Sequence, residues 1–306
     1  MTIAVVFPGQ GSQFAGMADP WTRHPAGRAV LDEAAEAMGR DVVAGANDEA
    51  ALATTEFVQP ALLACGVAAF RVLEAEGLAG VVGTAGHSLG EFAALVAAGV
   101  LPLAGALRVV VVRGAAMQRA GEARPGTMSA LLGAGADDAE ALCDEARGDD
   151  VLIVANRNSP VQSVISGSVA AIERAEAIAA GRRIRAVRLN VAGAFHSPLM
   201  ESAVGPIADE LARLEFSAPA FPVATNASGA LVTDAAELRS LLERHVVSPV
   251  RWQEDAQALA AAGAETFLEC GPGDVLTKMA KRVVPGAAAV AVGSPDAAAA
   301  AVSSAP

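Results

Sequence analysis

Residues 80–99 read GVVGTAGHSLGEFAALVAAG: a short apolar strand, a glycine-flanked serine and an alanine-rich helix follow one another directly. The central Gly86-His87-Ser88-Leu89-Gly90 has the Gly-x-Ser-x-Gly spacing of a nucleophile elbow. Glycines flank such a serine because its tight turn leaves no room for side chains. The turn exposes the Ser88 hydroxyl and lets the backbone N–H of Leu89 face a developing oxyanion. A chance match is the alternative, but strand and helix both lie where an elbow needs them.

Apolar segments typical of strands alternate with helical segments on both sides of this elbow. The expected strands cover 3–7, 80–85, 220–225, 266–270 and 289–293, and the clearest helices cover 60–76 and 103–120. Strands that alternate with helices indicate a largely parallel sheet that is covered by helices.

The middle of the chain has a different order of elements. Strands are expected at 128–133, 151–156, 161–167 and 184–190, with helices at 137–147 and 168–180. This β-α-β-β-α-β order is the ferredoxin-like arrangement. We therefore predict an α/β protein with a core of residues 1–125 and 191–306 and an inserted ferredoxin-like subdomain, residues 126–190. The segments ARPG (123–126) and NVAGA (190–194) are the expected hinges.

Composition excludes several classes of function. Of the 306 residues, 53% are hydrophobic and 18% are charged, which favours a packed core over disorder. The net charge of −12 argues against a nucleic-acid partner. The start MTIAVVFPGQGSQ lacks the basic region of a signal peptide, and no uncharged apolar run is long enough for a membrane span. We expect a cytoplasmic protein without a membrane partner.

The cysteines predict neither a metal site nor a disulfide. Cys65, Cys143 and Cys270 are odd in number and widely separated, and no pair has the spacing of metal ligands.

A serine nucleophile needs a base, and the chain has only four histidines. His196 follows the predicted subdomain in a polar turn and is the preferred candidate, and His245 is the other contender. His87 is held inside the elbow and His24 lies in a polar stretch. No carboxylate between Ser88 and His196 stands out as a third member, and a backbone carbonyl is the alternative partner of the base.

Two further polar residues have both a structural and a functional interpretation. Gln10, in Gly9-Gln10-Gly11 after the first strand, either supports an oxyanion hole or belongs to a plain turn. Arg113 interrupts an apolar helix, VVVRG. It either forms a buried salt bridge or binds a substrate carboxylate through its planar guanidinium.

Five motifs in this order resemble the malonyl-CoA:acyl carrier protein transacylases and the acyltransferase domains of polyketide synthases. The motifs are Gly9–Gln13, Gly86–Gly90, Arg113-Gly114, Ala194–Ser197 and Glu269–Gly273. The resemblance extends from residue 3 to about residue 283. It implies an α/β-hydrolase-like core with a ferredoxin-like subdomain, in agreement with the order of elements.

The resemblance also implies a role for each site residue. Ser88 is expected as nucleophile and His196 as base, with Gln10 and the Leu89 N–H as the oxyanion hole. Arg113 is expected to bind the malonyl carboxylate, while Gln59 and Asn158 match further pocket positions. The base is expected to be oriented by the backbone carbonyl of His245, where the family usually has Gln or Asn. The expected reaction takes malonyl from its coenzyme A thioester to the phosphopantetheine of a holo acyl carrier protein, without a bound cofactor or a metal.

Leu89 and Phe195 follow the malonyl-selective pattern of the family. Phe195 would crowd an α-methyl group, and a pocket discriminates against one such group by about 1–3 kcal/mol. The alternatives are a polyketide-synthase acyltransferase for another acyl-CoA, an acyl hydrolase that clears stalled carriers, and a non-catalytic carrier-binding module. Retention of Arg113 speaks against the hydrolase, and an intact Ser88, His196 and Gln10 against the binding module.

Two basic clusters are candidates for docking an acidic carrier protein, although such runs of charge are more often ordinary solvated surfaces. The first comprises Arg182, Arg183, Arg185 and Arg188, and the second comprises Lys278, Lys281 and Arg282.

Overall fold

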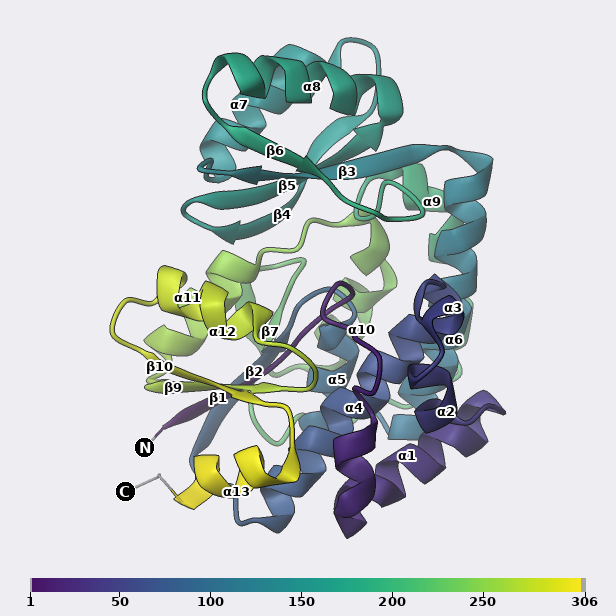
Figure 1. Cartoon of the computed structure of the whole chain (residues 1–306), viewed down its shortest axis with the longest axis vertical. Coiled ribbons are helices and arrows are strands. Elements are labelled where there is room, and N and C mark those ends of the chain that lie inside the picture. Colours follow the sequence, from purple (N-terminus) through teal and green to yellow (C-terminus); the bar gives the residue numbers. More distant parts are fainter. Residues whose placement is uncertain (1, 304–306) are drawn as a thin grey trace.

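The computed structural model describes residues 2–303 and has a larger lower body with a smaller layered unit above it (Figure 1). The strands are β1 (Ile3–Phe7), β2 (Val81–Gly86), β3 (Gly126–Leu132), β4 (Leu152–Ser159), β5 (Gln162–Ser168), β6 (Arg185–Arg188), β7 (Val223–Thr225), β8 (Ala230–Val232), β9 (Thr266–Cys270) and β10 (Ala288–Val292). The helices are α1 (Pro25–Met38), α2 (Val42–Ala46), α3 (Glu49–Leu52), α4 (Thr55–Ala75), α5 (Gly90–Ala97), α6 (Leu103–Ala123), α7 (Ala136–Arg147), α8 (Val169–Gly181), α9 (Glu201–Leu211), α10 (Ala235–Glu243), α11 (Trp252–Ala261), α12 (Val275–Val283) and α13 (Pro295–Ser303). The short 3-10 helices within residues 2–303 are η1 (Asp19–Arg23), η2 (Pro198–Met200) and η3 (His245–Val247).

The core sheet has the strand order β10-β9-β1-β2-β7-β8, and β8 alone runs antiparallel to its neighbour. Strand β1 lies inside this sheet and is buried along its whole length. Ile3, Val5 and Phe7 pack into the apolar cluster on one face, and Ala4 and Val6 pack into the cluster on the other. A parallel strand covered on both faces is expected to be continuously apolar, and this explains the sequence IAVVF. The largely parallel core is confirmed.

The small unit has the antiparallel strand order β4-β5-β3-β6. Helices α7 and α8 cover one face of this sheet and enclose an apolar cluster with Leu131, Leu152 and Ile165. The opposite face points toward the core (Figure 1). The observed order of elements, β3-α7-β4-β5-α8-β6, is the predicted ferredoxin-like one.

A short backbone bridge joins the small unit to the core close to the predicted base. Val250 N–H donates to Ala155 at 2.8 Å, and Arg157 N–H donates to Val250 at 2.9 Å. Strand β4 is thereby fixed to the segment between η3 and α11.

Some element boundaries differ from the predicted ones for local reasons. Helix α4 begins at Thr55 instead of residue 60, because the Thr54 hydroxyl accepts from the Phe57 N–H and caps the helix. Strand β7 begins at Val223 instead of residue 220. Pro222, directly before it, has no N–H to donate to a ladder.

Helix α4 is long and apolar enough to cross a membrane by length and composition, and it is the one such helix among residues 2–303. In the structure 89% of its apolar window is buried inside the protein. It packs against α1 and α6 as a core helix.

Candidate active site

The predicted elbow is formed at the carboxyl end of β2. Ser88 has a left-handed backbone with φ 50°, which a non-glycine residue rarely adopts. A Cβ on Gly86 would lie 1.9 Å from the backbone of Gly90, and one on Gly90 would lie 2.1 Å from the carbonyl oxygen of Phe7. Both glycines are therefore required by close packing, and the turn between them lifts Ser88 to the top of the sheet.

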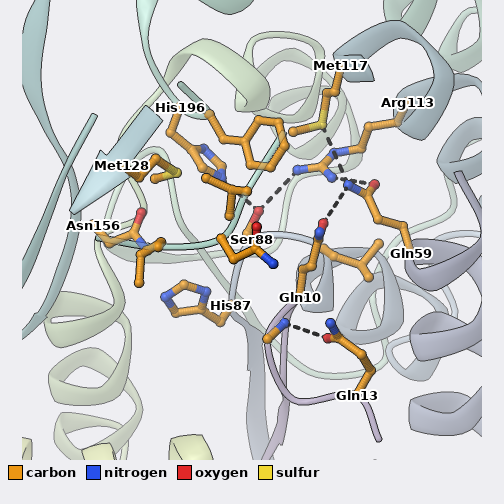
Figure 2. A pocket seen from close by; sticks show the side chains of 16 residues that line it. Gln10, Gln13, Gln59, His87, Ser88, Arg113, Met117, Met128, Asn156 and His196 are labelled. Carbon is orange, nitrogen blue, oxygen red and sulfur yellow. Dashed lines mark hydrogen bonds between the residues drawn. The ribbon is translucent and has the colours of Figure 1, made fainter. Parts of the chain in front are cut away.

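Ser88 and His196 are in direct contact although 108 positions separate them. Ser88 Oγ lies 2.7 Å from His196 Nε2, and Figure 2 shows the imidazole reaching toward the hydroxyl. His196 Nδ1 lies 3.1 Å from the carbonyl oxygen of His245 and 2.9 Å from that of Ser248. Since carbonyl oxygens only accept, Nδ1 carries the proton and the Nε2 lone pair faces the serine.

The environment keeps His196 neutral. Its side chain is buried, and burial, with a smaller contribution from the Arg113 charge, lowers the pKa of His196 to about 3. A neutral imidazole whose lone pair faces a hydroxyl can accept the hydroxyl proton.

Arg113 is a buried cation at the same serine. Nη2 donates to Ser88 Oγ at 3.1 Å, and Nη1 donates to Gln59 Oε1 at 2.6 Å. Burial lowers the pKa of Arg113 to about 10, so the guanidinium remains charged at neutral pH. No carboxylate in residues 2–303 forms an ion pair with it, and its Nε has no hydrogen-bond partner there. The structural salt bridge is thus not the arrangement seen, and a buried cation of this kind favours an anionic ligand.

Gln10 and Gln59 continue this polar network toward the first strand. Gln59 Nε2 donates to Gln10 Oε1 at 3.4 Å, while its Oε1 accepts from Arg113. Figure 2 shows Gln10 beside Ser88, on the side away from His196.

A cavity of about 260 Å³ opens above Ser88. Its walls include Leu89, Met117, Met128 and Phe195, and among its lining residues in the described chain Arg113 alone carries a full charge at neutral pH. The site can therefore accept a small group with an apolar body and one negative charge.

Asn158 lines a neighbouring cavity of about 220 Å³ and is absent from the walls of the first cavity. Its Oδ1 lies 2.9 Å from His87 Nε2. The two cavities share five lining residues, so a longer ligand can occupy both: Gln10, Gly11, His87, Asn156 and Leu189.

Several site residues were not predicted from the sequence. Ser248 provides the nearer of the two carbonyls at His196 Nδ1, and Asn226 accepts the Ser88 N–H at 2.7 Å. Asn226 directly follows β7, and the carboxyl ends of parallel strands meet at one edge of the sheet. This position at the end of a strand is the only signal in the sequence, and it does not distinguish Asn226 from an ordinary turn residue.

Within residues 2–303, no group of three or more His, Cys, Asp or Glu side chains could hold a metal ion. The three cysteines are buried and unpaired.

Comparison with known proteins assigns the family. A family model described as an acyl transferase domain matches residues 4–301. The chain belongs to this family. The resemblance found in the five motifs is confirmed by full-length relatives. A malonyl CoA-acyl carrier protein transacylase of Salmonella typhimurium is 42% identical over 306 residues and the match covers 98% of each chain. One of Bacillus subtilis is 37% identical and covers 96% of this chain and 94% of the relative.

Solved acyl transferase structures have the same fold. The malonyl-CoA:acyl carrier protein transacylase of Xanthomonas oryzae superposes with a TM-score of 0.94 at 41% identity and covers 99% of each chain. A malonyl-transacylase in complex with a type II polyketide-synthase acyl carrier protein gives a TM-score of 0.94 at 36% identity, again over 99% of each chain.

Proposed function

We propose that this acyl transferase moves a malonyl group from coenzyme A to the phosphopantetheine thiol of an acyl carrier protein through a malonyl-serine intermediate. The observation that carries the proposal is the double contact at Ser88 Oγ, with His196 Nε2 at 2.7 Å and Arg113 Nη2 at 3.1 Å. The names of the full-length relatives support malonyl as the acyl group, and the carrier complex of a structural neighbour supports the acceptor.

In the first half-reaction, His196 Nε2 takes the proton of Ser88 Oγ as the oxygen attacks the thioester carbonyl. The developing oxyanion is bound by the Leu89 N–H and the Gln10 side chain. Collapse breaks the C–S bond, and the imidazolium returns its proton to the coenzyme A thiolate. Arg113 holds the malonyl carboxylate through both steps, supported by Gln59.

In the second half-reaction, His196 takes the proton of the carrier's thiol, and the sulfur attacks the malonyl-serine ester. Collapse releases Ser88, which regains the proton from His196. The two adjacent cavities suit the narrow phosphopantetheine arm, and we assign Asn158 to the wall that this arm contacts. No cofactor is required, and a cytoplasmic location remains a prediction from the sequence.

The experiment is intact-protein mass spectrometry with malonyl-, methylmalonyl- and acetyl-CoA offered separately. Malonyl-CoA should add one malonyl mass, and Ser88→Ala should remain unlabelled while keeping its thermal stability. A holo carrier protein should then gain the mass that the enzyme loses, and fatty-acid and polyketide carriers are tested in parallel. Loss to water without gain by a carrier would favour the acyl hydrolase, and labelling of the alanine variant would contradict Ser88 as nucleophile.

A further inference from the structure

A buried polar cluster lies behind the elbow, on the side away from the cavity. Asn226, His245, Glu91 and Asp255 are each at most 1% exposed. The Asn226 side chain contacts the backbone of Ser88 and of Gly86. The other three side chains each contact Asn226.

Asn226 uses every hydrogen-bonding position of its amide. Oδ1 accepts from Ser88 N–H at 2.7 Å and lies 3.2 Å from His245 Nε2. Nδ2 donates to the Gly86 carbonyl at 2.7 Å and to Asp255 Oδ2 at 2.8 Å. Because a backbone N–H can only donate and a backbone carbonyl can only accept, the amide orientation is determined by the elbow itself.

The same reasoning gives the tautomer of His245. Its Nε2 faces the Asn226 oxygen, whereas its Nδ1 is buried without a partner in the described chain. A buried N–H without an acceptor is less tolerable than an unused lone pair, so the proton belongs on Nε2. His245 and His196 therefore carry their protons on opposite ring nitrogens.

These contacts close a ring. The Ser88 N–H donates to Asn226 Oδ1, which in turn contacts the His245 side chain. The backbone carbonyl of His245 contacts His196 Nδ1, and His196 Nε2 contacts Ser88 Oγ, which returns the ring to its first residue. The His245 carbonyl shares the Nδ1 proton with the Ser248 carbonyl, which gives the base two anchors.

We propose that the Asn226 and His245 side chains are positioning residues that complete this closed ring and fix the nucleophile and the base relative to each other. The proposal rests on the proposed function of Ser88 and His196. Both of these residues have left-handed backbones, with φ 50° and 57°. Such conformations persist only where the surroundings hold them, and the ring contacts both segments.

The first test is made on the unaltered protein and does not depend on activity. With 15N-labelled histidine, the chain gives four imidazoles, which single His→Gln variants assign. We expect His245 neutral with its proton on Nε2 and His196 neutral with its proton on Nδ1. A His245 proton on Nδ1 would break the ring at Asn226 and overturn the proposal, even if malonyl transfer is confirmed.

The second test uses a matched pair at His245. In His245→Gln, the side-chain amide can still donate to Asn226, whereas His245→Leu fills the space without a donor. We expect malonylation by the glutamine variant to stay close to that of the parent. In the leucine variant kcat for malonylation should fall by about 10²-fold, the cost of a small misplacement of reacting groups.

The KM for malonyl-CoA should not change in either variant, because the hydrogen bonds of Arg113 go to Gln59 and Ser88 and do not involve the His245 side chain. The proposal would be overturned if kcat for malonylation fell equally in both variants, or if its decrease followed a lowered melting temperature. If the leucine variant does not fold, the tautomer measurement still decides. Failure of malonylation in the parent protein would contradict the proposed function instead.

Discussion

Arg113 Nη2 lies 3.1 Å from Ser88 Oγ, so a cation of the cavity wall contacts the predicted nucleophile directly. The carboxylate and the thioester carbonyl of malonate are separated by one methylene group. A clamp for the carboxylate therefore has to lie close to the attacking oxygen, and this contact meets that requirement. It also explains why a charged residue interrupts the apolar helix α6.

Arg113→Ala should separate malonyl from acetyl transfer. Loss of one partner of a buried charge pair costs about 2–5 kcal/mol, which is roughly thirty- to several-thousand-fold in kcat/KM. Acetyl-CoA has no carboxylate and should lose far less. Arg119→Ala, an exposed position on the same helix, is the control. An unchanged ratio of kcat/KM between malonyl-CoA and acetyl-CoA, together with a lower melting temperature, would instead indicate a structural role for Arg113.

The acylation rate should be insensitive to pH where an ordinary histidine titrates. Only neutral His196 accepts the serine proton, and an unperturbed imidazole would be lost as base when the pH falls through 6.5. With its pKa lowered to about 3, the base stays neutral and malonylation should persist at about pH 5. Single-turnover malonylation between pH 5 and 8, with circular dichroism to confirm folding, measures this. A loss centred near 6.5 would contradict it.

The same shift makes a prediction for stability. Between about pH 3 and 6.5 the unfolded chain protonates His196 while the folded chain does not. The contribution of His196 to the free energy of unfolding is therefore complete above pH 6.5. It decreases as the pH falls from 6.5 to about 3.

Phe195→Ala should relax the choice of acyl group. Phe195 lines the cavity and is 7% exposed, so its removal opens space beside the acyl chain. Exclusion of one methyl group is worth about 1–3 kcal/mol, or 10- to 200-fold, and the methylmalonyl-to-malonyl ratio of kcat/KM should rise within that range. Phe216→Ala, outside the cavity and packed against Arg239, should leave the ratio unchanged. If Phe195→Ala leaves this ratio unchanged, other residues determine the selectivity between malonyl and methylmalonyl.

Carrier docking is expected on α12. Lys281 and Arg282 are exposed in its last turn, and the start of the same helix lines the second cavity. Reversal of both charges should raise KM for the carrier protein and leave KM for malonyl-CoA unchanged, because docking acts on the encounter with the acidic partner.

The first basic cluster is partly neutralised, since Arg182 pairs with Glu145 and Arg188 with Glu176. The double variant Arg182→Glu with Arg183→Glu is therefore expected to raise KM for the carrier protein less than reversal of Lys281 and Arg282. Arg28→Glu on α1, at the far end of the core from the small sheet, is the control (Figure 1). Unchanged carrier kinetics in both double variants would exclude both surfaces.

The parts of the site that could be predicted from the sequence are those with local signatures. The sequence predicts the elbow because strand, glycines and helix are contiguous, and it predicts His196 as base because the chain has only four histidines. The Ser248 carbonyl and the Asn226 amide act across 52 and 138 positions. A backbone carbonyl has no side-chain signature, and an asparagine after a short strand resembles any turn residue. Their roles follow from strand order, which one sequence does not specify.

The close packing around Gly86 and Gly90 has a consequence for the redesign of this scaffold. Neighbouring positions have opposite tolerance to mutation. Ser88 lines the cavity and, within the described chain, its hydroxyl contacts only the side chains of His196 and Arg113, so Ser88→Cys or Ser88→Ala displaces no backbone. One added carbon at either glycine would collide with main chain that no rotamer change can move. Laboratory evolution of new acyl chemistries should therefore leave both glycines invariant and draw its gains from the cavity wall.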